Sequence, residues 1–333
     1  MIMKTNLDGM MIPATAMLPD NIDVSIVIVN WNTREILRDC LTSLYANKAG
    51  VRAEVFVVDN ASSDGSADMV AQYFPEVLLI RNDVNAGFAA ANNIAIRRAR
   101  GRHVLLLNSD TLVHGAVITN SVAYLDENPD VGAMGCRVLN ADGTVQLTCS
   151  AWPSLANLML LTSGLWKLPF LSFLHGYRFD SWKRDTQRDV DVISGCYMLV
   201  RSEVIRRVGR LDENFFFFGE ETDWCRRIAK DGWKLRFAPV GEITHLGGGS
   251  SGSLNQRRDI MLTQAIVRLH YKHSGILAAS LAFAMLFIFN ASRLAFWQLA
   301  SRMMRHPKGA QRRKHFAGVV AGFAHAWPKA GRA

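Results

Sequence analysis

Four short runs of apolar residues occur in the first third of the chain, at residues 24–29, 55–58, 77–80 and 104–107. Apolar residues recur at helical spacing after the first run, at Ile36, Leu37, Cys40, Leu41, Leu44 and Tyr45, and again within residues 85–100. Strands that alternate with amphipathic helices predict an α/β fold, with a doubly wound, mostly parallel sheet. The runs are apolar throughout, which predicts strands buried on both faces.

Polar residues follow each apolar run directly, at residues 30–32, 59–66, 82–87 and 108–110. Any one of these segments is compatible with a turn or a helix N-cap. Because the carboxyl ends of parallel strands meet at one edge of the sheet, the four together predict a crevice large enough for a nucleotide. The last of them would carry Asp110 to the rim of that crevice.

The pattern is less regular in the middle of the chain. Residues 131–146 predict a hairpin-like extension of the sheet. Residues 155–174 are mostly apolar but interrupted, and fit either a helical pair packed on the core or an amphipathic lip for an oily acceptor. The charged residues 177–189 predict a mobile loop. Residues 191–200 predict a strand containing Gly195, and a glycine inside a strand often marks a bulge or the close approach of backbone or ligand.

Three acids, Glu220, Glu221 and Asp223, fall in the first turn of a predicted helix that ends near Gly232. The helix macrodipole stabilises acids at this position, which is a purely structural explanation. Four phenylalanines at residues 215–218 precede them, however, and an apolar wall raises the pKa of a carboxyl group toward that of a useful general base. The segment is therefore a candidate for acid–base chemistry.

A short strand is predicted at residues 235–237, and His245 then precedes a glycine-rich loop. A histidine beside such a loop can turn toward a bound diphosphate and its metal, although a lone histidine is more often a satisfied polar residue. Neither G-x-G-x-x-G nor the phosphate-loop motif follows the first apolar run. This absence argues against a dinucleotide-dependent dehydrogenase and a P-loop kinase.

Composition places the chain among globular proteins, with 333 residues, 49% hydrophobic and 20% charged, enough for one large core with appendages. The five cysteines form no C-x-x-C pair, which argues against a zinc ribbon or a disulfide framework and fits a reducing cytosol. Residues 1–22 lack the layout of a secretory signal and are expected to form a loose N-terminal extension.

The net charge of +9 comes from the C-terminal segment. No Asp or Glu occurs after Asp259, where 11 Lys and Arg are found, and the chain before it is nearly neutral. A basic and apolar segment favours an anionic membrane surface over nucleic acid.

Residues 274–292 are 19 uncharged residues, at the lower limit for a bilayer span. A span would put the basic residues 302–314 on the side opposite the rest of the chain, against the positive-inside tendency. We therefore expect a monotopic or re-entrant helix, with Phe296 and Trp297 at the interface; a core helix covering the sheet is the alternative.

The polar segments and the acidic helix together resemble the family 2 glycosyltransferases, which have the GT-A fold, and within them the rhamnosyltransferase-like branch. The resemblance covers residues 24–273. It is carried by the motifs at residues 26–32, 57–66, 85–93, 107–110 and 217–224. It implies a catalytic domain at residues 23–273, followed by membrane-associating helices and a tail at residues 274–333.

The resemblance also implies roles for individual residues. Glu221 is similar to the catalytic base, and Asp110 to the last acid of the DXD motif that holds a divalent metal, Mg²⁺ or Mn²⁺, with His245 as a further ligand that leans toward Mn²⁺. The residues implied in nucleotide binding are Asn30, Asn32, Asp59, Asn85, Gly87, Phe88, Asn108 and Asp110. The residues that we place in the acceptor or sugar pocket are Gly195, Glu220, Asp223 and Trp224.

Two positions depart from the pattern of the family. Asn108 stands where the DXD motif has its first acid, so metal coordination rests on fewer carboxylates. Glu221 replaces the more usual aspartate, which leaves Glu220 and Asp223 as rival candidates for the base.

The function implied is inverting transfer of a sugar from a nucleotide-diphosphate donor, with dTDP-rhamnose favoured by the resemblance and UDP- and GDP-sugars left open. The acceptor expected is a lipid-linked saccharide, at the cytoplasmic face of the inner membrane, in cell-surface polysaccharide synthesis. A sugar nucleotidyltransferase is one alternative, but residues 30–34 do not supply its glycine-rich and basic loop. A non-catalytic membrane assembly partner is the other. The sequence predicts no nucleic-acid partner and no particular oligomeric state.

Overall fold

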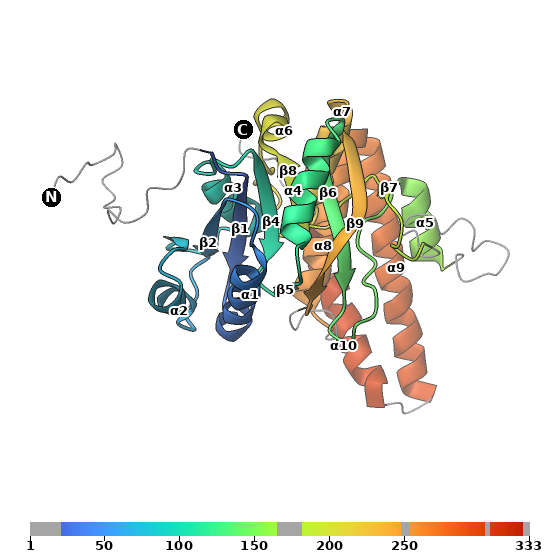
Figure 1. Cartoon of the computed structure of the whole chain (residues 1–333). Coiled ribbons are helices and arrows are strands. Elements are labelled where there is room, and N and C mark those ends of the chain that lie inside the picture. The colour runs from blue at the N-terminus through green and yellow to red at the C-terminus, as the bar shows by residue number, and fades with distance from the viewer. Residues whose placement is uncertain (1–20, 165–181, 248–253, 304–306, 329–333) are drawn as a thin grey trace.

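A computed structural model describes residues 21–164, 182–247, 254–303 and 307–328 (Figure 1). Its centre is a sheet with the strand order β3-β2-β1-β4-β8-β6-β9-β5, in which β7 also pairs with β9. The strands are β1 (Val24–Asn30), β2 (Ala53–Asp59), β3 (Leu78–Arg81), β4 (His103–Asn108), β5 (Thr111–Val113), β6 (Val131–Leu139), β7 (Arg188–Asp189), β8 (Tyr197–Arg201) and β9 (Lys234–His245). The four apolar runs of the sequence are β1 to β4, and these strands are parallel to one another, as predicted.

Helices cover both faces of the sheet (Figure 1). Side chains of α1 (Arg34–Asn47), α2 (Ser66–Tyr73) and α4 (Val117–Glu127) pack on one face. Side chains of α3 (Phe88–Ile96), α6 (Ser202–Val208) and α7 (Glu220–Lys230) pack on the other. Along β4, Leu105 and Leu107 belong to the first core, and Val104 and Leu106 belong to the second. This alternation is the two-residue period of a strand buried on both sides.

Strand register places the polar ends of three strands side by side. Asn30 is the register partner of Asp59 at the ends of β1 and β2, and Val29 is the partner of Asn108 at the end of β4. The predicted gathering of polar residues at one edge is therefore confirmed for these strands.

Strands β9 and β5 bring a further pair to the same edge. Strand β9 extends over 12 residues to His245, well beyond the predicted residues 235–237. The three-residue β5, which the sequence pattern did not predict, pairs antiparallel with it, with Thr111 opposite His245. Asp110, directly before β5, consequently lies next to His245.

Two other expectations are corrected. Gly195 is not inside a strand, because β8 begins at Tyr197 and Gly195 lies in the turn before it. Part of the expected mobile loop packs on the core: Arg184 is fully buried, and the Trp182 ring meets the Phe237 ring edge to face at 4.7 Å, whereas the other described residues of the loop are exposed. Of the helical pair expected at residues 155–174, the structure contains one helix, α5 (Leu155–Ser163). Residues 165–181 lie outside the described residues.

The C-terminal helices α8 (Gln256–Ser274), α9 (Ile276–Met303) and α10 (Pro307–Gly322), with the short η3 (Phe323–Ala326), form a bundle with α5. Its core includes Leu158 of α5, Val267 of α8, Leu286 of α9 and Val319 of α10. Helix α10 approaches α8 closely at two glycines: a Cβ at Gly318 or Gly322 would lie less than 3 Å from the ends of the Gln256 and Ile260 side chains, respectively, which would have to move.

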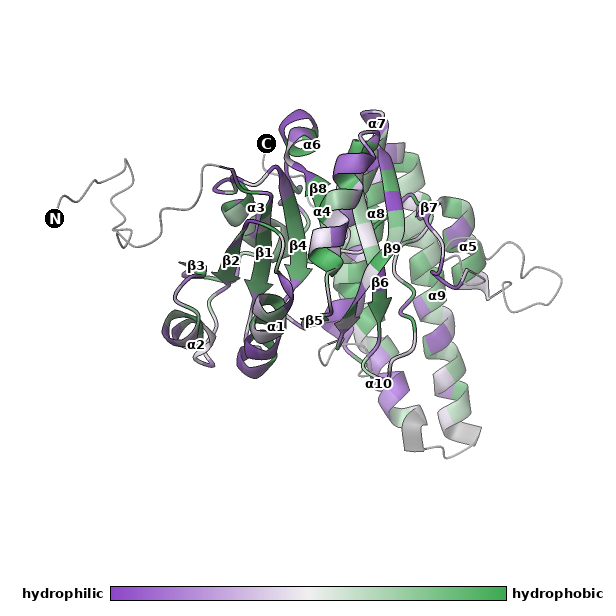
Figure 2. Cartoon of the chain, viewed as in Figure 1, coloured by the Kyte–Doolittle hydropathy of each residue, from purple (hydrophilic) through white to green (hydrophobic). Residues whose placement is uncertain are grey.

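Helix α9 has a long apolar face that no described residue covers. Ile276–Ser301 is long and apolar enough to cross a membrane, and 22% of its most apolar stretch is buried. Its exposed large side chains are Ile276, Leu277, Leu281, Phe287, Ile288, Phe296 and Leu299. The helix contacts α5, α8 and α10 rather than the sheet, which argues against the core helix considered above. Figure 2 shows the apolar character of α9 along most of its length.

Candidate active site

The ends of β1 and β2 form one wall of the site. Asn30 is fully buried, and its Nδ2 donates to Asp59 Oδ1 and to Ser62 Oγ, both at 3.2 Å. Asp59 in turn accepts from the Ser62 backbone N–H at 3.0 Å. Asn32 takes a left-handed conformation, φ 55°, and its side chain accepts from the Ser63 N–H at 2.7 Å. The predicted Asn30, Asn32 and Asp59 therefore lie in two neighbouring segments, at the ends of β1 and β2, that hydrogen bonds join.

Asn60 joins this wall to the loop before α3, a role that the sequence did not reveal. It is 3% exposed; its Nδ2 donates to Asn85 Oδ1 at 2.8 Å, and its Oδ1 accepts from the Ala86 N–H at 3.0 Å. The Gly87 N–H donates to Asn85 Oδ1 at 3.0 Å. Asn60 thus fixes the position of the predicted Asn85 and Gly87.

Gly87 and Phe88 are held against the segment that carries the four phenylalanines. The Phe88 N–H donates to the Phe216 carbonyl oxygen at 2.8 Å. Gly87 has φ +84°, and a Cβ there would lie 2.5 Å from that same oxygen. Only glycine therefore fits this close approach without displacing the backbone. The contact brings the loop before α3 next to the segment that precedes α7.

Asp110 and His245 approach each other across the β5–β9 pairing. His245 Nε2 lies 3.1 Å from Asp110 Oδ1 and 3.3 Å from Asn108 Nδ2, and His245 Nδ1 lies 2.8 Å from Gln146 Oε1. If Nδ1 donates to Gln146, Nε2 accepts from the Asn108 amide N–H, and its lone pair and the Asp110 carboxylate oxygen converge beside Asn108.

A divalent cation fits this convergence. Among the described residues there is no group of three His, Cys, Asp or Glu that could hold a metal. Asp110 and His245 would therefore supply two ligands, with Asn108 beside them. The remaining positions would fall to oxygens of a bound phosphate-bearing ligand and water, as is usual for Mg²⁺.

The two glutamates at the start of α7 follow a strained turn. Phe218 has φ 71° and Gly219 φ 88°, and a bulky residue in the left-handed region is rare. Glu220 is 4% exposed, and the Oε2 atoms of Glu220 and Glu221 are buried without a hydrogen-bond partner among the described residues. These orphaned oxygens indicate a place for a hydroxyl donor.

Burial raises the pKa of Glu220 well above its ordinary range, and the neighbouring Glu221 charge raises it further. Burial also raises the pKa of Glu221, while backbone N–H groups and a hydrogen bond from Glu220 act in the opposite direction. We therefore assign the proton of this pair to Glu220 and the ionised state to Glu221. A proton-sharing pair of this kind supplies one carboxylate that can act as a base.

Gly195 lies between the two halves of the site. A Cβ built there would be 3.7 Å from the Phe88 ring and 3.9 Å from Glu221 Cβ. The structure therefore brings Gly195, Phe88 and Glu221 together, although they are far apart in sequence.

Asp223 and Trp224, predicted in the acceptor or sugar pocket, lie behind the site instead. Asp223 is fully buried and accepts from Lys272, His273 and Arg227, each at 2.8 Å, so it joins α7 to α8. Burial raises its pKa, but the bonds from His273 and Lys272 outweigh this and lower the pKa to about 2. Trp224 is fully buried and donates to the Gly209 carbonyl oxygen. Burial, two cationic partners and the bond to His273 make Asp223 a structural anchor and a poor base.

The family model for glycosyl transferase family 2 matches residues 25–209. This is more than half of the chain, which therefore belongs to this family of glycosyltransferases. The N-acetylglucosaminyl-diphospho-decaprenol L-rhamnosyltransferase of Mycobacterium tuberculosis is 26% identical over 211 residues, covering 60% of this chain and 68% of that protein. The low-salt glycan biosynthesis hexosyltransferase Agl10 of Haloferax volcanii is 26% identical over 227 residues, covering 67% of each.

Solved structures confirm the GT-A fold. The mannosyltransferase PcManGT of Pyrobaculum calidifontis, in complex with GDP-Man and Mn²⁺, has a TM-score of 0.54 at 18% identity and covers 92% of this chain and 87% of its own. GalNAc-T7, with UDP, GalNAc and Mn²⁺, has a TM-score of 0.54 at 16% identity, covering 92% of this chain and 56% of its own. At these identities the likeness establishes the fold alone.

Proposed function

We propose that this chain is an inverting glycosyltransferase that moves a sugar from a nucleotide-diphosphate donor to a hydroxyl of a lipid-linked saccharide. One observation carries the proposal. Glu221, to which we assign the ionised state, lies beside Gly195, which is also next to the Phe88 ring, and its buried Oε2 has no hydrogen-bond partner among the described residues. A carboxylate with a raised pKa and an oxygen that has no hydrogen-bond partner among the described residues suits the deprotonation of an acceptor hydroxyl.

The residues of the chain would have the following roles in the reaction. Asn30, Asn32 and Asp59 bind the nucleotide, and Asn85, Gly87 and Phe88 form the loop that flanks it. Glu221 takes the proton of the acceptor hydroxyl, whose oxygen bonds to the anomeric carbon as the bond to the diphosphate breaks. A divalent cation at Asp110 and His245 supplies positive charge for the leaving diphosphate. A single displacement of this kind inverts the anomeric centre.

For the donor we propose dTDP-rhamnose and for the acceptor a saccharide on a polyprenyl diphosphate. The similarity to the L-rhamnosyltransferase of Mycobacterium tuberculosis, named for a decaprenol-linked diphosphate acceptor, supports both choices. A hard cation with one imidazole ligand is compatible with Mg²⁺ and Mn²⁺, and the two solved neighbours contain Mn²⁺.

We place the enzyme at the cytoplasmic face of the inner membrane, attached through the exposed face of α9. Spanning by α9 is disfavoured because α10 returns beside it: Gln256 of α8 donates to the Lys314 carbonyl oxygen, and His315 pairs with Asp259. The exposed charges of α10 would otherwise be drawn into the bilayer.

Vesicle flotation tests this attachment. The chain should float with anionic vesicles, and the double variant Leu281→Asp with Ile288→Asp should remain in the bottom fraction of the gradient. The variant Tyr73→Asp, at an exposed aromatic of α2, should float like the wild type. Flotation of the double variant would refute attachment through α9.

The two alternatives are less well supported. A sugar nucleotidyltransferase needs a basic phosphate-binding loop after β1, where this chain has a turn of Asn32 and Thr33. A non-catalytic assembly partner would have no need for a buried pair of glutamates, because burying carboxyl groups without partners destabilises the fold.

The proposal is tested with a panel of dTDP-, UDP- and GDP-sugars and a lipid-linked saccharide acceptor. Transfer from one donor class, with a product whose anomeric configuration by NMR is opposite to that of the donor, is the expected result. Retention of configuration would refute the single displacement. Absence of transfer from every donor would favour the non-catalytic partner.

A further inference from the structure

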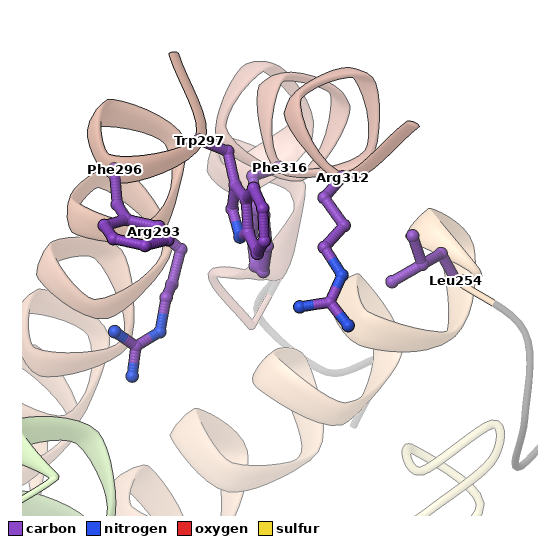
Figure 3. A pocket seen from close by; sticks show the side chains of 6 residues that line it. All are labelled: Leu254, Arg293, Phe296, Trp297, Arg312 and Phe316. Atoms are coloured by element: carbon purple, nitrogen blue, oxygen red, sulfur yellow. The ribbon is translucent and has the colours of Figure 1, made fainter. Parts of the chain in front are cut away.

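A pocket between α9, α10 and the start of α8 lies apart from the candidate active site (Figure 3). Its volume is about 390 Å³, and it is lined by Leu254, Arg293, Phe296, Trp297, Arg312 and Phe316. Figure 3 shows the two guanidinium groups on either side of the Trp297 and Phe316 rings. Aromatic walls with two cations make this a site for a ligand that is both anionic and apolar.

The charge of the two arginines is not balanced by an acid among the described residues. Neither Arg293 nor Arg312 forms an ion pair within the described part of the chain, and the full sequence has no Asp or Glu beyond Asp259. Asp259 itself pairs with His315. Each guanidinium instead packs on a ring, Arg293 on Phe289 and Arg312 on Trp297, both at 4.8 Å. Packing of this kind orders the side chains while leaving N–H donors for a phosphate.

A second pocket shares Leu254 with the first and continues the positive charge. It is lined by Leu254, Asn255, Gln256, Arg257, Gln311, Lys314 and His315. Arg257 and Lys314 therefore add two cations beside the arginine pair. A phosphate-bearing headgroup larger than one phosphate would be accommodated across both.

The apolar side of the pocket is continuous with the exposed face of α9. Phe296 lines the pocket and is also 57% exposed on that face, which continues to Leu299. An apolar chain that leaves the pocket past Phe296 would remain on the surface proposed to contact the membrane. Inorganic phosphate would satisfy the arginines but not this apolar wall.

The pocket lies at the same end of the molecule as the donor site. Helices α9 and α10 extend beyond the end of the sheet where β4, β6 and β9 finish (Figure 1). Leu254 follows His245 by nine residues, so the two are at most about 32 Å apart along the chain.

We propose that this pocket binds the diphosphate of the polyprenyl-linked acceptor, with its first isoprene units on Phe296, Trp297 and Phe316. This inference rests on the proposed function, because it assigns to that enzyme a second site for its acceptor. A volume of about 390 Å³ suits a headgroup and a short apolar segment rather than a whole polyprenyl chain.

Binding and catalysis test the proposal separately. In the binding arm, farnesyl diphosphate is the probe, with inorganic diphosphate, farnesol and phosphatidylglycerol vesicles as comparisons. The full chain should bind farnesyl diphosphate at least tenfold more tightly than inorganic diphosphate or farnesol. The double variant Arg293→Gln with Arg312→Gln should lose at least tenfold of that affinity. Arg313→Gln, at an exposed arginine of α10 outside the pocket, should bind like the wild type.

In the catalytic arm, the double Gln variant should raise KM for the lipid-linked acceptor at least tenfold. It should leave transfer to a short alkyl glycoside of the same saccharide unchanged, which also shows that the variant is folded. In the double variant Arg293→Lys with Arg312→Lys, the KM for the lipid-linked acceptor should lie between those of the wild type and the double Gln variant. Lysine keeps the positive charge but not the paired N–H donors of arginine.

Unchanged farnesyl diphosphate affinity in the double Gln variant would overturn the proposal. Arginine-dependent binding to phosphatidylglycerol vesicles that farnesyl diphosphate does not displace would also overturn it and assign the site to a phospholipid headgroup. If the wild-type chain binds farnesyl diphosphate through these arginines but transfers no sugar, the proposed function would be contradicted. The assignment of the pocket to a polyprenyl diphosphate would still hold.

Discussion

His245 Nε2 lies 3.1 Å from Asp110 Oδ1 across the β5–β9 pairing. Two residues 135 positions apart in sequence thus meet at the edge where β1, β2 and β4 also end. In the proposed function this pair would hold the divalent cation, because Asn108 contributes an amide where the motif of the resembling family has an acid.

Metal removal should abolish transfer. We expect EDTA to eliminate activity, Mn²⁺ or Mg²⁺ to restore it, and Asp110→Asn to lower kcat/KM about 100-fold through loss of transition-state charge stabilisation. Gln146→Leu should raise the half-activating metal concentration about 10-fold to 100-fold while saturating metal restores the rate, because Gln146 only orients His245. Full activity in EDTA would contradict the metal assignment.

The glutamate pair should set the acid limb of the pH–rate profile. Because burial raises the pKa of both carboxyl groups, kcat/KM should rise with pH through an inflection above 4.5, the ordinary glutamate value. Glu220→Gln keeps a hydrogen-bond donor to Glu221 and should move the inflection little. Glu220→Leu removes the donor and should move it upward. An inflection at or below 4.5 in the wild type would contradict the assignment.

The same pKa shifts affect stability with a definite sign. The folded-state pKa of Glu220 exceeds its unfolded value, so its contribution to stability is full at low pH and is lost as pH rises through the folded pKa. Glu220→Gln should therefore show less loss of stability toward alkaline pH than the wild type, as measured by urea unfolding.

Asp223 should behave in the opposite way. Its pKa of about 2 lies below the ordinary 3.8, so its stabilisation is present above about pH 4 and is lost as pH falls toward 2. Asp223→Asn should lower the free energy of unfolding at pH 7 by about 3 kcal/mol, because it leaves Lys272 and Arg227 without their buried partner. The difference in the free energy of unfolding between Asp223→Asn and the wild type should become smaller as pH falls toward 2.

An exposed ion pair provides the control for this measurement. Asp130 and Lys234 are 2.7 Å apart, but both side chains are about half exposed, so Asp130→Asn should change stability far less than Asp223→Asn does. Equal effects of the two substitutions would show that the Asp223 network does not join α7 to α8 as described.

Gly87→Ala should disrupt the donor loop. The new Cβ would lie 2.5 Å from the Phe216 carbonyl oxygen, which must move and weaken its bond from the Phe88 N–H. We expect the donor KM to rise and kcat/KM to fall about 100-fold, a loss of about 2.7 kcal/mol in transition-state binding. Gly232→Ala has the same kind of backbone, φ +93°, with open space around it, and should retain kcat/KM. Equal losses of kcat/KM in Gly87→Ala and Gly232→Ala would indicate that backbone strain, and not the contact with Phe216, causes the effect.

Local patterns predicted much of the fold and some of the site. Each of the strands β1 to β4 is an apolar run followed directly by polar residues. This pattern lies within a few consecutive residues, so the sequence alone predicts Asn30, Asp59 and Asp110 as site residues. The acids of α7 were found in the same way, because they lie in one helical turn.

The rest depended on contacts between distant parts of the chain. Gln146 meets His245 across 99 positions, and Asp223 meets His273 across 50, so neither partnership leaves a local pattern. Strand β5 is three residues long and is defined by its pairing with β9. Asn60 lay within a recognised polar segment, but its role depends on where Asn85 and Gly87 fold back.

The central claim is that Glu221 deprotonates the acceptor hydroxyl. Single-turnover transfer with saturating donor and acceptor tests it most directly, in Glu221→Gln and in Glu203→Gln, which alters an exposed acid in the first turn of α6. Loss of a general base predicts a rate at least about 100-fold below wild type for Glu221→Gln and a wild-type rate for Glu203→Gln. A wild-type rate for Glu221→Gln, with the fold intact, would contradict the account.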